Sequence, residues 1–150
     1  NPNIKPYHKF AFVNLNLGLN ESTIKWKAEV KSNSNWVCIG VCLKELVKEN
    51  NFKFTNSNID EDKKSFFGIS SNGFIWNRNN ELQNNKRFEN LKFSPLKQIV
   101  YFSYDCKDMT LKINVNGYDI VLNGVFAEDG MKLVPCVVFL KNGDSVKFYL

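Results

Sequence analysis

The chain has 150 residues, of which 43% are hydrophobic and 14% aromatic, and its formal net charge is +5. This length suits one domain, residues 1–150, with its own core; the composition excludes a disordered chain, and no run approaches the roughly 20 apolar residues that span a bilayer. The basic residues are scattered and nearly all lysine, whereas nucleic-acid-binding proteins usually cluster theirs on one face, so we expect neither a nucleic-acid partner nor membrane insertion.

The first half of the chain predicts short strands separated by turns. Residues 24–30 alternate between apolar and charged side chains, with Trp26 on the apolar side, which is typical of a half-buried strand. Residues 36–43 are nearly all apolar, as in a central strand that is covered on both faces. Gly40 within this run predicts the close approach of a neighbouring strand. The pattern predicts strands at 7–13, 24–30 and 36–43, and one helical turn at 44–50.

The second half of the chain predicts a series of hairpins. Asn72-Gly73 and Asn116-Gly117 lie between apolar runs and carry the strongest short-range hairpin signal, and Asn142-Gly143 predicts a last hairpin. Pro135 predicts an edge position or a bulge. About ten strands with frequent turns indicate an all-β protein, an antiparallel β-sandwich. The predicted strands cover residues 66–70, 74–77, 100–104, 110–115, 118–122, 132–140 and 145–150.

Four sequence blocks occur in an order that resembles a SPRY domain. They are "KWKAEV" with "VCIGVC", "FFGISSNGFIW", "VYFSYDCKDMTLKINVNG" and "LVPCVVFLKNGDSVKF". The resemblance runs from about Ile24 to the C-terminus, with Phe67 where tyrosine is usual, and too few residues precede the first block for a full PRY subdomain. The third block has four of the family's positions in register: Asp105, Leu111, Asn116 and Gly117.

The resemblance implies a bent β-sandwich, jelly-roll or concanavalin-like, without catalytic activity. It implies a module that binds a protein or peptide through loops on one rim, as a scaffold, an adaptor or a substrate receptor of a ubiquitin ligase. We expect the domain to be a monomer. The residues themselves show no phosphate-binding glycine loop and no nucleophile elbow, and the sole histidine is His8. The alternative is a ligand-binding sandwich that recognises a carbohydrate or a phosphorylated small molecule.

The loop that follows Trp76 is the first candidate for partner binding, because long loops in compact domains commonly carry function. Trp76 leads into an asparagine-rich segment, where an exposed ring can serve as a binding hot spot. The only arginines, Arg78 and Arg87, lie in or beside this loop. Arginine suits bidentate contacts with carboxylates or phosphates.

The loop that follows Leu43 is the second candidate. Phe52 and Phe54 lie there among polar residues, and they either staple the loop to the sandwich or await a partner. Trp36 stands where a turn enters a strand and can serve as a rim anchor. The predicted partner-binding residues are Trp36, Phe52, Phe54, Trp76, Arg78, Asn79, Asn80 and Arg87.

The four cysteines show neither a Cys-x-x-Cys pair nor a nearby histidine. Cys38 and Cys42 share a face of one predicted strand but lie about 13 Å apart, too far for a disulfide. We therefore expect reduced thiols, no metal, no cofactor and an intracellular, cytoplasmic protein. Because the chain begins at Asn1 rather than Met, we expect a domain excised from a longer protein.

Overall fold

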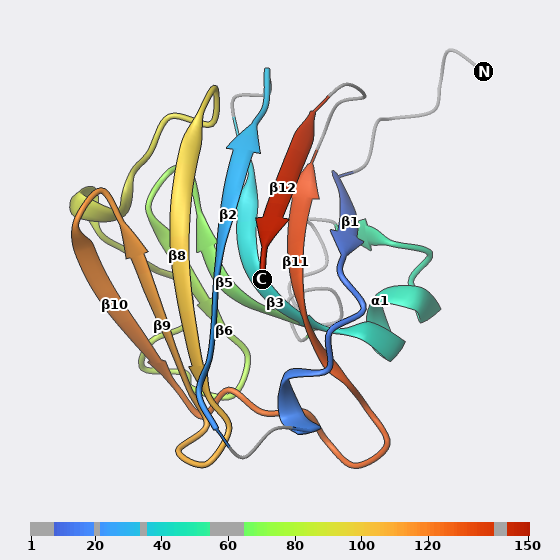
Figure 1. The fold of residues 1–150 in the computed structure, drawn as a ribbon. Helices are drawn as coiled ribbons and strands as arrows, with labels where there is room; N and C mark the ends of the chain where they lie inside the picture. The colour runs from blue at the N-terminus through green and yellow to red at the C-terminus, as the bar shows by residue number, and fades with distance from the viewer. Residues whose placement is uncertain (1–7, 20–21, 34–35, 55–64, 140–143) are drawn as a thin grey trace.

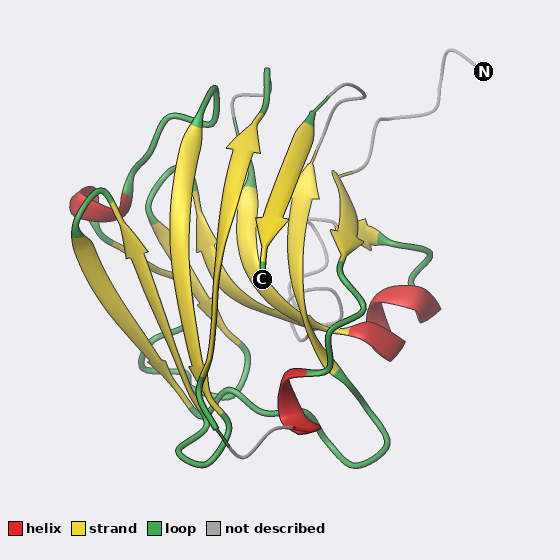
Figure 2. Ribbon diagram, viewed as in Figure 1, coloured by secondary structure: helices red, strands yellow, loops and turns green. Residues whose placement is uncertain are grey.

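The computed structural model of the protein describes residues 8–19, 22–33, 36–54, 65–139 and 144–150. Strands dominate the described chain (Figure 2) and form two antiparallel sheets. The predicted all-β antiparallel sandwich is confirmed.

The seven-stranded sheet has the order β4-β1-β11-β3-β5-β6-β7, and the five-stranded sheet has the order β10-β9-β8-β2-β12 (Figure 1). Within the described residues, one α-helix and two short 3-10 helices lie in the connections. The elements are β1 (His8–Phe12), η1 (Leu17–Leu19), β2 (Ile24–Lys31), β3 (Cys38–Leu43), α1 (Lys44–Glu49), β4 (Lys53–Phe54), β5 (Phe66–Ser70), β6 (Phe74–Asn77), β7 (Lys86–Arg87), η3 (Glu89–Leu91), β8 (Gln98–Asp105), β9 (Thr110–Val115), β10 (Tyr118–Asn123), β11 (Leu133–Phe139) and β12 (Ser145–Tyr149).

The main core lies between the two sheets. Apolar and charged side chains alternate along β2, so the apolar ones all point into this core. Trp26 is 4% exposed and stacks on Phe102, with 5.1 Å between the ring centroids. All residues of β3 are buried, because this strand is central in its sheet and apolar on both faces. The sequence-based expectations for both strands are confirmed.

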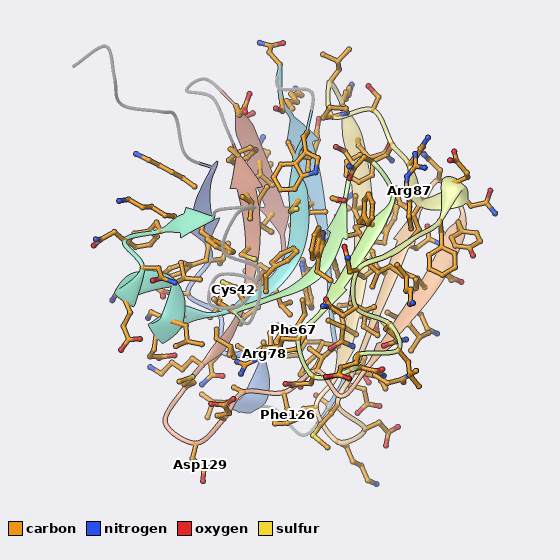
Figure 3. All side chains as sticks on the ribbon, turned by 180° about the vertical axis from the view of Figure 1, so that it is seen from behind. Cys42, Phe67, Arg78, Arg87, Phe126 and Asp129 are labelled. Atoms are coloured by element: carbon orange, nitrogen blue, oxygen red, sulfur yellow. The ribbon has the colours of Figure 1, made fainter. Side chains whose placement is uncertain are left out.

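A second apolar cluster covers the other face of the seven-stranded sheet. Alternate residues of β3 point into it, and Val47 of α1 packs against it, which explains why the helix follows β3 directly. Cys42 marks this cluster in Figure 3. The buried members are Phe10, Cys38, Cys42, Val47, Phe66, Trp76, Val134, Cys136 and Val138.

Two predicted turns are confirmed, whereas the predicted hairpin at Asn142-Gly143 is wrong. Asn116-Gly117 joins β9 to β10 with positive φ at both residues, as a tight hairpin turn requires. Asn72-Gly73 turns β5 into β6, with positive φ at Gly73 alone. The predicted last hairpin is wrong because β11 and β12 belong to different sheets, so residues 140–143, which lie outside the described part, connect the sheets.

Pro135 does not lie on an edge strand, since β11 runs between β1 and β3. Its carbonyl accepts a hydrogen bond from the backbone N–H of Val13 at 3.0 Å, just beyond the last paired residue of β1. The missing N–H of the proline therefore also faces the end of β1, where the ladder stops. An interior strand tolerates the proline there because only a terminal hydrogen bond is lost.

Candidate functional site

The strands of the sandwich run between two rims, and the loops of one rim form a groove that carries exposed apolar side chains. We call this the Phe126 rim; it consists of η1, the turn at 106–109 and the loop at 124–132. Figure 3 shows Phe126, Asp129 and Arg78 at this end of the molecule and Arg87 toward the opposite end.

Backbone and side-chain hydrogen bonds hold the turn at 106–109. The Asp105 carboxylate accepts from the backbone N–H groups of Lys107 and Asp108, at 2.9 and 3.1 Å. Met109 has a φ of 54°, a left-handed conformation that is uncommon outside glycine and asparagine. These contacts fix the conformation of the turn, so its side chains are presented in one arrangement.

Two hydrogen bonds fasten the neighbouring loop to this turn. The backbone N–H of Val125 donates to the Met109 carbonyl at 2.9 Å, and the Tyr104 hydroxyl donates to the Val125 carbonyl at 2.6 Å. Burial raises the pKa of Tyr104 to about 12, with smaller contributions from the nearby Cys106 and Asp105. Tyr104 is therefore a neutral donor at physiological pH, and it places Phe126 beside Met109.

The groove on this rim has a volume of about 340 Å³. Leu19, Met109 and Phe126 contribute apolar side chains that are 80%, 42% and 39% exposed. Apolar side chains gathered on loops at one rim are typical of a surface that binds another molecule. The groove is lined by Asn16, Gly18, Leu19, Tyr104, Cys106, Met109, Phe126, Ala127, Glu128, Asp129, Gly130, Met131 and Leu133.

Arg78 forms an ion pair with Glu128, one of the residues that line this groove. Its Nη2 lies 2.7 Å from a carboxylate oxygen of Glu128, and its side chain is only 12% exposed. Its Nη1 is buried and has no hydrogen-bond partner among the described residues. The guanidinium thus stabilises the 124–132 loop through a charge-assisted hydrogen bond.

The asparagine-rich segment after Trp76 is held mainly by its own amides. Asn79 Nδ2 donates to the Gly124 carbonyl at 2.9 Å, and Asn80 Oδ1 accepts from the N–H of Leu82 at 3.1 Å. Asn77 is fully buried and donates to the Asn123 carbonyl at 2.8 Å. These contacts dock the segment against the end of β10, so Asn79 and Asn80 already bond within the domain.

Arg87 lies away from Arg78 because the hairpin of β6 and β7 carries the chain back along the sheet. It pairs with Phe74, and its Nε donates to the Asn72 carbonyl at 3.2 Å. Its guanidinium also lies 3.3 Å from Glu89. A hydrogen bond from Lys92, together with the charges of Lys92 and Arg87, lowers the pKa of Glu89. The structure therefore separates the two arginines that the sequence places near one loop.

The predicted aromatic residues lie apart from the Phe126 rim. Trp76 is 6% exposed within the second apolar cluster, so its ring is not the exposed hot spot that the sequence suggested as a possibility; Trp36 packs, partly buried, against the same cluster. Phe52 stacks on Phe12, with ring centroids 5.7 Å apart, and so staples its loop to the sandwich. Phe54 belongs to β4, but its side chain lies outside the described part.

Sequence reasoning missed Leu19, Met109 and Phe126. One signal was available for Phe126, which stands between Asn123-Gly124 and Asp129-Gly130. An aromatic residue bracketed by two turn pairs lies on a short surface loop, where its side chain has little to cover it. Leu19 and Met109 carry no such signal, because their exposure depends on which loops the fold brings together.

The described residues contain neither a metal-binding cluster nor a membrane-spanning helix. No group of three or more histidine, cysteine, aspartate or glutamate side chains there is arranged to hold a metal ion. No helix of the described chain has the length and apolar character needed to cross a bilayer.

No family model matches this sequence, and no curated protein matches it either. Among solved structures, the SPRY domain of human HERC1 superposes with a TM-score of 0.61 at 14% sequence identity. The match covers 95% of this chain and 82% of that one. The chain has a SPRY-like fold. The fold expected from the resemblance of the four sequence blocks is therefore confirmed.

Proposed function

We propose that this domain is a protein-interaction module that binds a peptide or a folded protein at the Phe126 rim. The observation that carries the proposal is the groove whose exposed apolar residues Leu19, Met109 and Phe126 lie on loops fastened by hydrogen bonds. Loops that are ordered before binding lose little conformational entropy when a partner docks. The SPRY-like fold supports the proposal, since the resemblance implies binding through loops at one rim.

The biological role that fits such a module is that of an intracellular scaffold or adaptor. Three buried and unbridged cysteines support a location where thiols stay reduced. A role as substrate receptor of a ubiquitin ligase is the narrower form of this proposal. Co-purification of ligase subunits with the intact protein, lost when the Phe126 rim is altered, is the result expected for that role.

The experiment is to identify a partner by affinity capture and mass spectrometry and then to titrate the purified partner by calorimetry. The double variant Phe126→Ser with Met109→Asn removes the apolar surface, and asparagine tolerates the left-handed backbone of Met109. We expect binding to weaken by about 30-fold or more, the effect of losing a hot spot worth roughly 2 kcal/mol.

The matched control is Leu96→Ser, which removes a 64% exposed apolar side chain outside the Phe126 rim. This control should bind the partner as the unaltered domain does. Equal affinities for the double variant and the control would place the binding surface elsewhere. The predicted contacts of Trp36, Phe52, Phe54 and Arg87 would then be tested next.

A further inference from the structure

The outer face of the five-stranded sheet carries a second groove that the rim proposal does not use. It has a volume of about 520 Å³ and lies over β2, β8, β9 and β12. Apart from Trp26 and Phe102, which are buried in the main core, its strand residues occupy outward-facing positions. The lining residues are Lys25, Trp26, Lys27, Tyr101, Phe102, Ser103, Lys112, Asn114, Tyr149 and Leu150.

All charged side chains that line this groove are positive. Three lysines line it, Lys25, Lys27 and Lys112, and its described lining includes no carboxylate side chain. None of the three forms an ion pair with any residue that the structure describes. The nearest carboxylate along β2 belongs to Glu29, which already lies 3.6 Å from Lys31 and accepts a hydrogen bond from Tyr149.

The spacing of the lysines matches an extended chain. Lys25 and Lys27 are successive outward residues of β2, so their Cα atoms lie about 7 Å apart, the distance between alternate residues of a strand. Lys25 and Lys112 both flank Ser103, on neighbouring strands at either side, and are therefore about 10 Å apart. An extended segment with carboxylates at alternate positions can reach these amino groups together.

The aromatic side chains favour a peptide over a nucleic acid. Tyr101 is 51% exposed in the middle of the groove and offers a surface for an apolar side chain. Tyr149 is not an open platform for base stacking, because the amino groups of Lys27 and Lys147 lie 5.0 and 5.9 Å from its ring centroid. Neither arginine contributes to the groove, and arginine is the usual bidentate reader of phosphate.

We propose that this lysine-lined sheet face binds an acidic, extended segment of a protein partner, with alternate carboxylates on Lys25, Lys27 and Lys112 and an apolar side chain on Tyr101. The surface is distinct from the Phe126 rim, so the domain has two binding surfaces. The complementary charges would speed association and weaken binding as salt rises.

The test uses fluorescence anisotropy with a labelled peptide of alternating glutamate and valine. We expect binding that weakens with added salt, and no binding of the same peptide with glutamine in place of glutamate. The triple variant Lys25→Gln, Lys27→Gln, Lys112→Gln should lose roughly tenfold in affinity, because it removes three ion pairs that each contribute little at a protein surface. Tyr101→Ser should weaken binding several-fold without changing the net charge.

The matched control carries Lys9→Gln, Lys48→Gln and Lys86→Gln, three exposed lysines outside the groove. It has the same net charge as the triple variant and should bind the glutamate peptide normally. An equal loss of affinity in both variants would show that binding depends only on the net charge of the domain, and this would overturn the proposal. So would an absence of binding at physiological salt.

Two competing ligands decide the chemical class. If an oligothymidylate displaces the peptide and binds more tightly, the face is a nucleic-acid site and the peptide assignment is wrong. If inorganic phosphate displaces the peptide far below the concentration at which acetate does, the ligand is a phosphorylated molecule. The Phe126→Ser variant should bind the glutamate peptide unchanged, so failure of the rim proposal and failure of this one are distinguishable.

Discussion

Tyr104 connects the core of the sandwich to the Phe126 rim through a single hydroxyl. The side chain is 2% exposed, and its O–H donates to the Val125 carbonyl at 2.6 Å. In Tyr104→Phe the ring remains but the buried carbonyl loses its donor, which costs about 1–2 kcal/mol of stability. Urea unfolding at neutral pH should show this loss, and equal stability of the two proteins would contradict the role given to the hydroxyl.

Titration of the same hydroxyl should make the stability of the folded protein depend on pH in the alkaline range. Its pKa is raised from 10.0 to about 12 in the folded protein. A raised folded-state pKa contributes stability that is fully present below pH 10 and is lost as the pH rises toward 12. The difference in stability between the unaltered protein and Tyr104→Phe should therefore shrink across this window. A difference that stays constant would show that the hydroxyl is not the titrating group.

At the scale of elements, the packing of β3 against β5 depends on two facing glycines. Gly40 pairs with Gly68, and a Cβ added to Gly40 would lie 2.1 Å from the backbone oxygen of Phe67. Backbone cannot yield as a flexible side chain does, so Gly40→Ala should destabilise the domain by about 3 kcal/mol or more. Thermal unfolding measures this effect.

Gly18→Ala is the control for this prediction. A Cβ at Gly18 would meet only a side-chain oxygen of Asn16, at 3.5 Å, an ordinary contact distance. This variant should stay within about 0.5 kcal/mol of the unaltered protein. A Gly40→Ala variant that is equally stable would mean that β3 and β5 lie further apart than the register indicates.

The sequence predicted most elements because their signals are local. Alternation along β2, the uninterrupted apolar run of β3 and the Asn-Gly pairs each depend on neighbouring residues alone. Gly40 belongs to this group, since a glycine within a strand commonly marks a close approach. The prediction from Pro135 was wrong because the number of hydrogen bonds that a proline removes depends on where the neighbouring strand β1 ends. The position of β1 in the sheet cannot be predicted from the residues around Pro135.

The candidate site was predicted less well because rims are assembled from distant segments. Trp76 was a candidate for an exposed hot spot, but the second apolar cluster covers it, and nothing near it in the chain indicates a second layer. Arg78 and Arg87 are close in sequence, yet the β6–β7 hairpin returns the chain and separates them. The predicted contacts of the eight candidate residues with a partner stay a prediction.

At the scale of the whole molecule, the seven-stranded sheet has apolar side chains packed on both faces. The reactivity of three buried thiols can be used to measure when this packing opens. Cys38 and Cys42 of β3 and Cys136 of β11 are fully buried in the second apolar cluster. Burial raises the pKa of the Cys38 and Cys136 thiols, and for Cys136 the neighbouring Cys42 adds to the effect. A buried, protonated thiol is a poor nucleophile.

Cys106 differs from the other three, since it is only partly buried at the Phe126 rim, where its thiol donates to the Gly18 carbonyl at 3.5 Å. With a thiol-specific disulfide reagent, we expect Cys106 to react first in the native protein and all four thiols to react in denaturant. Cys106→Ser should abolish the fast reaction.

Pulsed labelling across a urea series then tests whether the two apolar layers unfold together. Because β3 and β11 are adjacent interior strands whose side chains enter both layers, their thiols should become reactive only with the global loss of strand signal. Labelling of Cys38, Cys42 and Cys136 at lower urea than that transition would show that the second layer opens on its own. Recovery of a stoichiometric disulfide from the purified native protein would instead contradict the proposal that the thiols are reduced and the protein intracellular.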